Sequence, residues 1–331
     1  MERFETTDYH TAGEPFRIVT AGAPAPPGRT VLERRDAARQ PRYERIRRLL
    51  CHEPRGHAGM YGCFLVPPDD DGAHLGALFW HAHGYSTACG HGTMALGVWA
   101  VETGRVQAAA TGTTEVVLDV PSGRVRARVT GRAGSVRSVA FRNVPARVVA
   151  RRVAVATSAG AVTVDVADGG ALYASLPAAA AGAAVQPTDL DRLVALSREI
   201  KQALDGSPVA QHPHDPRLSG IYGTIFHDDL GSEEGCLRQR NVTVFADGQV
   251  DRSPCGSGTC ARVALLADEG RLDVGQELVH ESIVGTVFRA RAVEHVAAGL
   301  VVEVEGHAVR TGEHRFVLDP CDELPDGFLL G

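Results

Sequence analysis

The stretch Cys89-Gly90-His91-Gly92-Thr93 recurs about half a chain length later as Cys255-Gly256-Ser257-Gly258-Thr259. Both copies have the pattern C-G-x-G-T, and the agreement continues on either side at the same offset. The further matching pairs are Leu78-Phe79 with Val244-Phe245, Ala95 with Ala261, Glu102 with Asp268, Gly104 with Gly270, and Arg105 with Arg271. Chance agreement between Gly- and Ala-rich segments is the alternative, but the extended match favours an internal duplication.

Each half of the chain has the same predicted order of elements. A short apolar run, typical of a buried strand, is followed by a polar turn, the motif, and a segment rich in Ala, Leu and Val. The runs are Leu75–Trp80 and Val242–Phe245, and the predicted helices are Met94–Thr103 and Cys260–Glu269, ended by Gly104 and Gly270. Both motif cysteines are therefore expected at the N-terminal end of a buried helix.

The remaining pattern indicates an α+β protein made of two lobes of similar plan. Further strands are predicted at Glu115–Val120, Arg124–Thr130, Ser138–Asn143, Val148–Thr157 and Val162–Val166, with an amphipathic helix over Pro187–Leu204. We expect residues 1–118 to form the first lobe and residues 119–305 the second. The C-terminal tail, from about residue 306 to 331, is expected to return to the first lobe.

Composition narrows the class of protein. The net charge of −6 argues against a nucleic-acid or anionic-membrane partner. No apolar run is long enough for a membrane span, and Met1 to Ala21 lacks the apolar region of a secretory signal, so we expect a cytoplasmic protein. Seven cysteines at irregular spacing do not suggest a disulfide scaffold. We expect a small-molecule substrate and a homodimer as the candidate assembly.

A thiol at the start of a helix suits proton transfer. The first turn presents unpaired N–H groups and the positive end of the helix dipole, which bind a carboxylate and lower the pKa of a thiol. Glycines at the first and third positions after each cysteine let the backbone approach a ligand. If the lobes face each other, Cys89 and Cys255 lie on opposite sides of one carbon. One thiolate then removes the Cα proton while the other thiol delivers a proton to the far face, without metal or pyridoxal.

Other residues are weaker candidates. His91 is expected to contact the substrate or Cys89, with an ordinary polar cap as the alternative. Asp251 is expected to bind the substrate ammonium, with a turn or N-cap aspartate as the alternative. The remaining cysteines are interpreted as small buried side chains, namely Cys51, Cys63, Cys236, Cys260 and Cys321.

The motifs in their wider context resemble those of the proline racemase family. The resemblance is carried by Ser86–Thr93, by Asp251–Thr259, by His10-Thr11-Ala12-Gly13-Glu14-Pro15 and by Glu53-Pro54-Arg55-Gly56. It implies the two-lobed fold shared with diaminopimelate epimerase, no cofactor or metal, and Cys89 and Cys255 as the acid/base pair. It further implies His91 and Asp251 near the substrate nitrogen, with backbone donors to the carboxylate at Gly90, His91, Gly256 and Ser257.

The family includes proline racemase, 4-hydroxyproline 2-epimerase and trans-3-hydroxy-L-proline dehydratase, so two activities stay open. Gly84–Thr87, His57–Gly62 and Asp326–Leu330 resemble the dehydratase branch, which has threonine where this chain has Cys255. Stereoinversion needs a second acid/base group, whereas dehydration needs one base at Cα and loss of the C3 hydroxyl. We therefore favour an isomerase inverting Cα of proline or hydroxyproline, with a hydro-lyase as the alternative.

Two other classes of function fit less well. A metal-binding or non-catalytic ligand-binding protein could use the available Cys, His and Asp, but C-x₂-C pairs are absent from the sequence. A cysteine hydrolase or transferase could use Cys89 with His91 as base, but it leaves Cys255 without a role.

Overall fold

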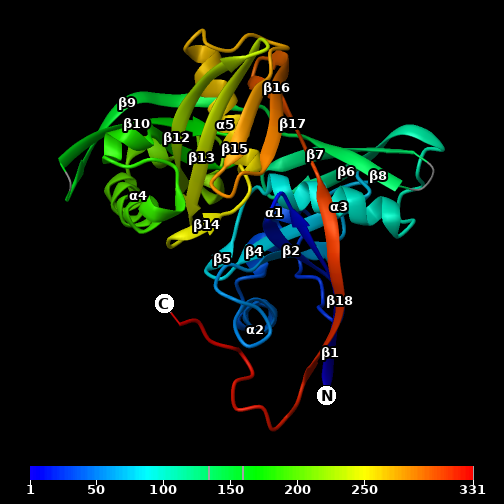
Figure 1. The fold of residues 1–331 in the computed structure, drawn as a ribbon. Coiled ribbons are helices and arrows are strands. Elements are labelled where there is room, and N and C mark those ends of the chain that lie inside the picture. Colours follow the sequence, from blue (N-terminus) through cyan, green and yellow to red (C-terminus); the bar gives the residue numbers. More distant parts are fainter. Residues whose placement is uncertain (133–134, 159, 331) are drawn as a thin grey trace. The chain divides into compact units, whose positions relative to one another are not determined.

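The structure is a computed structural model that describes residues 1–132, 135–158 and 160–330. Its contacts divide the chain into two compact units, Met1–Val139 with His307–Gly331, and Ala140–Gly306. Few helices and many strands make up each unit (Figure 1), so the predicted α+β class is confirmed. Among the described residues, no helix has the combined length and apolar character needed to cross a membrane.

The first unit is a sheet that surrounds one buried helix. Its elements are β1 (Glu2–Thr11), β2 (Glu14–Ala21), α1 (Val31–Ala37), α2 (Pro41–Cys51), β3 (Tyr61–Val66), β4 (Leu75–His81), β5 (Gly84–Tyr85), α3 (Gly90–Glu102), β6 (Thr111–Val120), β7 (Gly123–Arg132) and β18 (Ala308–Leu318). Helix α3 contacts β1, β2, β6, β7 and β18. Because strands cover it on several sides, α3 is apolar around most of its circumference, and eleven of its residues are buried.

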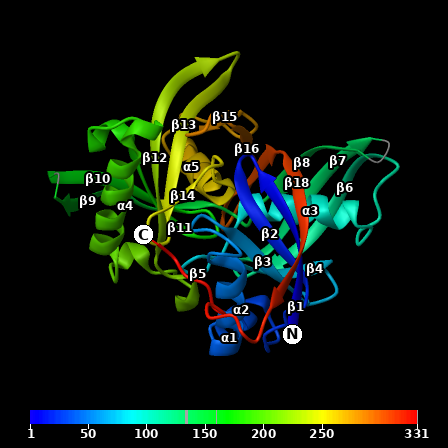
Figure 2. The same cartoon turned by 60° about the horizontal axis from the view of Figure 1, so that its bottom comes forward.

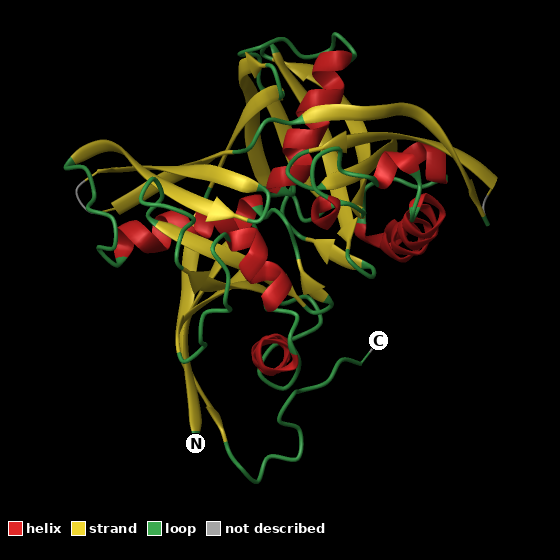
Figure 3. Ribbon diagram, turned by 180° about the vertical axis from the view of Figure 1, so that it is seen from behind, coloured by secondary structure: helices red, strands yellow, loops and turns green. Residues whose placement is uncertain are grey.

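The second unit repeats this plan around α5 (Gly256–Asp268), which contacts β9 (Arg147–Thr157), β10 (Gly160–Asp168), β11 (Leu172–Pro177), β16 (Val287–Val296) and β17 (Gly299–Gly306). Its other elements are β12 (Ile221–Glu233), β13 (Cys236–Phe245), β14 (Gln249–Asp251), β15 (Leu278–Ser282), α4 (Leu190–Leu204) and the 3-10 turns Ala178–Ala181, Pro187–Asp189, Pro208–Ala210 and Pro216–Leu218. Strand β8 (Ser135–Arg142) crosses the division between the units. Figures 2 and 3 show α5 among the strands of its own unit.

Strand pairing shows the duplication directly. In the first unit, successive pairs from β1 through β2, β3, β4 and β6 to β7 are antiparallel, parallel, antiparallel, parallel and antiparallel. The series from β10 through β11, β12, β13 and β15 to β16 has the same alternation. The short strands β5 and β14 each add one antiparallel pair, so the order of both halves agrees element by element.

The predicted helix ends are also found. Cys89 and Cys255 are the N-cap residues of α3 and α5, and Gly104 and Gly270 follow the helices with φ of 69° and 66°. Glycine adopts this left-handed conformation without steric cost, which is why it ends both helices. The predicted helix over Pro187–Leu204 begins as a 3-10 turn and continues as α4.

The division of the chain differs from the boundary expected near residue 118. Strand β6 pairs along its whole length with β7, and α3 packs against β7. Both strands therefore stay with the first unit, and the division falls after Val139. The tail contributes β18, which pairs antiparallel along β1 in that same unit.

Candidate active site

The first of the two predicted half-sites is the start of α3, where Cys89 forms the N-cap. Its sulfur accepts a hydrogen bond from the backbone N–H of Gly92 at 3.2 Å, so the thiol takes the place of the usual Ser or Asp oxygen. Its carbonyl accepts the N–H and the hydroxyl of Thr93, at 3.0 and 2.8 Å. Cys89 is only 4% exposed, so the sulfur is fixed in a nearly dry position at the positive end of the helix.

Glycine is required at position 92 by this geometry. A Cβ added there would lie 2.7 Å from Sγ of Cys89 and 2.4 Å from the ring of Phe16. Position 258 is similar, because an added Cβ would lie 2.9 Å from Sγ of Cys255. The second glycine of each motif therefore lets the helix start approach its sulfur closely.

The structure brings the predicted residue His91 together with Cys89. Both ring nitrogens of His91 lie 3.5 Å from Sγ of Cys89. The imidazole packs edge-on against Tyr61 and Phe16, whose ring centroids lie 4.8 and 5.7 Å from its own. The backbone carbonyl of His91 accepts a hydrogen bond from Thr11 Oγ1 at 3.0 Å. Since His91 is buried and oriented by two aromatic rings, its contact with the sulfur is a defined one.

The second predicted half-site is the start of α5. Cys255 is 6% exposed and has φ of 62° and ψ of 104°, a conformation that costs a non-glycine residue on the order of 1–3 kcal/mol. Its N–H donates to Ser253 Oγ at 3.1 Å and its carbonyl accepts the N–H of Thr259 at 2.7 Å. Strained backbone of this kind is concentrated at functional positions in proteins.

Asp251 is connected to Cys255 through one serine. The Oδ1 atom of Asp251 accepts from the N–H and the hydroxyl of Ser253 at 2.8 and 2.7 Å, and that hydroxyl in turn accepts from the N–H of Cys255. Burial raises the pKa of Asp251, while the Ser253 donors lower it. The predicted residue therefore lies in the same half-site as Cys255 and also shapes the turn that precedes α5.

Tyr173 on β11 belongs to this half-site and was not predicted. Its hydroxyl hydrogen-bonds with Oγ of Ser257 at 2.7 Å and lies 3.9 Å from Sγ of Cys255. Tyr222 packs edge-on against it, with ring centroids 5.9 Å apart. The segment Gly220-Ile221-Tyr222-Gly223 repeats the pattern of Gly59-Met60-Tyr61-Gly62, and this repeat is the sequence feature that points to Tyr222. Tyr173 lies in no motif.

The pKa of Cys255 differs from the expectation. Burial and the neighbouring Asp251 carboxylate raise it well above the ordinary thiol value. The N–H of Gly258 and the hydroxyls of Thr243 and Tyr173 lower it, but by less. The expected lowering at a helix start is thus wrong for Cys255 in this structure, because desolvation of the sulfur outweighs the helix field.

The other five cysteines fall into two groups. Cys51, Cys63 and Cys260 are buried as expected, and burial raises the pKa of Cys51 and of Cys260 to about 12. Cys236 is half-buried and Cys321 is exposed, so the expectation of buried side chains is wrong for these two. Across the part of the chain that the structure describes, no group of three or more His, Cys, Asp or Glu is arranged to hold a metal ion.

The backbone donors expected at Gly90, His91, Gly256 and Ser257 lie in the first turns of the two helices. N–H groups in a first turn have no partner within the helix, which leaves them available to a carboxylate. The chain thus has two α+β repeats, each with a buried helix that starts at a cysteine, and this defines a class of duplicated α+β proteins with a thiol at both helix starts.

Comparison with known proteins identifies the family within that class. The sequence model of the proline racemase family matches residues 6–329, and the chain belongs to this family. It is 43% identical to a trans-3-hydroxy-L-proline dehydratase of Bacillus thuringiensis subsp. konkukian, over 99% of this chain and 98% of that protein. It is 42% identical to a 3-hydroxyproline 2-epimerase of Burkholderia multivorans, over 98% and 97% of the two chains.

A solved structure gives the same fold. A hydroxyproline epimerase from Agrobacterium vitis with bound trans-4-hydroxy-L-proline matches with a TM-score of 0.93 and 27% identity, over 100% of this chain and 95% of that one. The predicted family and fold are confirmed. The protein is an enzyme of a family whose members similar to this chain are epimerases and dehydratases.

Proposed function

We propose that the enzyme inverts the Cα configuration of proline or a hydroxyproline without a cofactor, using Cys89 and Cys255 as opposed acid and base. The observation that carries this proposal is the equivalent position of the two cysteines in the two repeats. Each belongs to the N-cap residue of a buried helix, and each lies close to a glycine three residues later. A mechanism with a single thiol would give the second cysteine at a helix start no role.

The proposed steps conserve atoms and charge. The Cys89 thiolate takes the proton from Cα, the electron pair is delocalised into the substrate carboxylate, and the Cys255 thiol delivers a proton to the opposite face. The enzyme is then left with Cys89 protonated and Cys255 as thiolate, ready for the reverse substrate. N–H groups at both helix starts stabilise the negative charge that grows on the carboxylate. The proposal requires the two helix starts to face one ligand in the closed enzyme.

The environment of Cys255 suits the role of acid in the first step. A buried thiol next to a carboxylate is held protonated, as the raised pKa of Cys255 indicates. His91 lies 3.5 Å from the sulfur of Cys89 and is placed to stabilise a thiolate there or to contact the substrate nitrogen. Asp251 is the candidate partner of that nitrogen in the other half-site.

A dehydratase is the second candidate, and the 43% identity to a trans-3-hydroxy-L-proline dehydratase favours it. In that reaction Cys89 removes the Cα proton and the C3 hydroxyl leaves as water. The product is an enamine that becomes a cyclic imine and then a keto acid. We propose a free small molecule as substrate and the cytoplasm as the place of action for either activity, with a homodimer as the candidate assembly.

The test uses the wild-type enzyme in heavy water with L-proline, trans-4-hydroxy-L-proline and trans-3-hydroxy-L-proline in separate reactions. Optical rotation, Cα deuterium and the amount of remaining substrate are followed together. Inversion predicts that rotation changes and deuterium enters at Cα while the total of the two epimers stays constant. Formation of a keto acid from the 3-hydroxy substrate, without an epimer from any of the three, would overturn the epimerase in favour of the dehydratase.

A further inference from the structure

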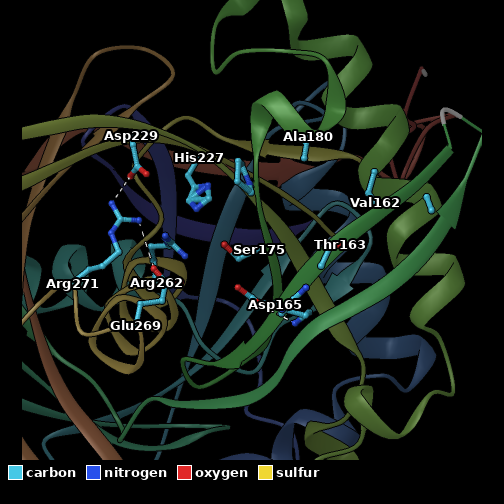
Figure 4. A pocket seen from close by; sticks show the side chains of 13 residues that line it. Val162, Thr163, Asp165, Ser175, Ala180, His227, Asp229, Arg262, Glu269 and Arg271 are labelled. Atoms are coloured by element: carbon cyan, nitrogen blue, oxygen red, sulfur yellow. Dashed lines mark hydrogen bonds and ion pairs between the residues drawn. The ribbon is translucent and has the colours of Figure 1, made fainter.

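A cavity of about 480 Å³ lies entirely within the second unit, away from the start of α5. Its lining residues come from β9, β10, β11 and β12, from Arg262 at the middle of α5, and from Glu269 and Arg271 just after that helix (Figure 4). Arg262, which lines it, follows Cys255 by nearly two helical turns, a rise of roughly 10 Å. The cavity is therefore separate from the thiol, and the mechanism proposed above gives it no role.

Three polar side chains at this cavity are almost completely buried. Ser175, His227 and Arg262 are 3%, 6% and 2% exposed, and Figure 4 shows them directed into the same space. Among the residues that the structure describes, Oγ of Ser175 and Nδ1 of His227 have no hydrogen-bond partner. Buried polar atoms in folded proteins are nearly always satisfied, so these two atoms point to a missing ligand.

Among the described residues, Arg262 carries a buried charge that forms no direct ion pair. Within the described part of the chain, its guanidinium makes one hydrogen bond, from Nε to Oε1 of Gln239 at 2.9 Å, and no ion pair. Gln239 is neutral and in turn donates a hydrogen bond to Oδ1 of Asp229, so Arg262 is connected to a carboxylate only through this amide. A buried charge without a direct ion pair is costly, and the cost is reflected in the pKa of Arg262, which burial lowers to about 10 although the carboxylates of Glu269, Asp229 and Asp165 act to raise it.

The equivalent helix of the first unit has no charge at this position. At the offset that matches the two motifs, Arg262 of α5 corresponds to Leu96 of α3, a fully buried core residue. The same position on an equivalent helix is thus apolar in one unit and cationic in the other. Because leucine is the ordinary solution for a buried helix, the arginine points to a purpose other than packing.

The three acidic residues at the cavity, Asp165, Asp229 and Glu269, form their ion pairs with other arginines and act on Arg262 only through space, where they raise its pKa. Asp229 forms an ion pair with Arg271 at 3.2 Å, and Glu269 with Arg151 at 3.0 Å. These pairs lie nearer to solvent, with Arg271 38% exposed and Asp229 50% exposed. Arg262 is therefore the most deeply buried charge of the cavity, while the charges nearer to its rim are balanced.

We infer that this cavity binds a small oxyanion, either a carboxylate or a phosphate, through the guanidinium of Arg262 and the hydroxyl of Ser175. A guanidinium matches two oxygens of such an anion with parallel N–H donors. His227 completes the site as a neutral partner, because burial and the nearby charge of Arg262 lower its pKa well below the ordinary value. The inference is independent of the reaction catalysed at the two cysteines.

The test measures thermal unfolding and binding calorimetry with inorganic phosphate and, separately, with acetate at constant ionic strength. The variant Arg262→Leu copies the residue of the first unit, and Ser175→Ala removes the hydroxyl. Arg289→Leu is the matched control, because it removes the same charge from an arginine that is 58% exposed in the same unit. At least one anion is expected to raise the Tm of wild type and of Arg289→Leu.

Arg262→Leu is expected to weaken that binding at least about tenfold and, without anion, to unfold at the wild-type temperature or above it. If Arg262→Leu fails to fold, Arg262→Gln takes its place, because glutamine keeps an amide for the Gln239 contact but removes the charge. Arg262→Gln is expected to weaken anion binding to a similar extent. The stronger of the two responses identifies the anion as phosphate or carboxylate. Unchanged binding in the arginine variants, or no anion-dependent shift in wild type, would overturn the inference.

Discussion

The backbone N–H of Gly92 donates a hydrogen bond to the sulfur of Cys89 over 3.2 Å, and the absence of a side chain at position 92 permits it. An added Cβ would overlap both that sulfur and the ring of Phe16. The contact makes the sulfur part of the helix cap, so its position and its charge both depend on the first turn of α3.

Replacing Gly92 by alanine is therefore expected to move the thiol out of line and to lower kcat by about 10²-fold, since small displacements of catalytic groups have effects of this size. Steady-state kinetics and Tm are measured together. Gly104→Ala at the other end of α3 is the control, because an added Cβ meets no atom within 4 Å there. It is expected to cost about 1 kcal/mol of stability through its φ of 69° while keeping kcat. Wild-type kcat in Gly92→Ala would show that the contact is dispensable.

Tyr173 is expected to act as a positioning residue for the second thiol. Its hydroxyl lies 3.9 Å from Sγ of Cys255 and lowers the pKa of that thiol. Tyr173→Phe is predicted to shift the alkylation profile of Cys255 to higher pH, measured by mass spectrometry of the modified peptide. Tyr9→Phe in the first unit, which loses a hydrogen bond to Glu102, is the control and should leave that profile in place. An identical profile in both variants and wild type would exclude a role of the hydroxyl at the sulfur.

Acid is expected to destabilise the second unit through His280 on β15. The side chain is fully buried, hydrogen-bonds with Thr259 at 2.8 Å, and burial lowers its pKa to about 3. In the unfolded state the imidazole takes up a proton at about pH 6.5, whereas in the folded state it stays neutral until about pH 3. Folding with a neutral His280 is therefore unpenalised above pH 6.5, and the free energy of unfolding falls as the pH drops from 6.5 toward 3.

Urea unfolding at pH 7 and pH 4 measures this effect. Between pH 7 and pH 4, the free energy of unfolding of wild type is predicted to fall by about 3 kcal/mol more than that of His280→Gln. The difference grows by about 1.4 kcal/mol for each pH unit below 6.5. His295→Gln, at an exposed position on β16 of the same unit, is the control and should follow wild type. Equal losses in wild type and His280→Gln would contradict the assignment of this acid sensitivity to His280.

The helix starts could be predicted from sequence because their signals are local. A cysteine followed by two spaced glycines marks each start, and Gly104 and Gly270 mark the ends. The repeat between the two motifs added the duplication of the fold, which the strand pairing confirms. In contrast, the division after Val139 depends on the pairing of β6 with β7 and on packing against α3, which no local pattern encodes.

The residues of the site that sequence analysis missed reach it through tertiary contacts between elements far apart in the chain. Tyr173 reaches Ser257 from a short strand 84 positions earlier in the chain, and His280 reaches Thr259 from a strand that follows α5. The pKa of Cys255 was predicted in the wrong direction for the same reason. The helix field is visible in a sequence, but the burial and the Asp251 carboxylate that outweigh it are properties of the folded unit.

The two-thiol assignment is tested most directly by Cys255→Thr, assayed in heavy water on whichever of the three imino acids the wild-type enzyme inverts. Threonine keeps a hydroxyl at the start of α5 but cannot exchange a proton near neutral pH as a thiol does. We predict that inversion falls by at least about 10³-fold while the protein stays folded, because the far face of Cα has lost its acid. Inversion at the wild-type rate in Cys255→Thr would contradict the account.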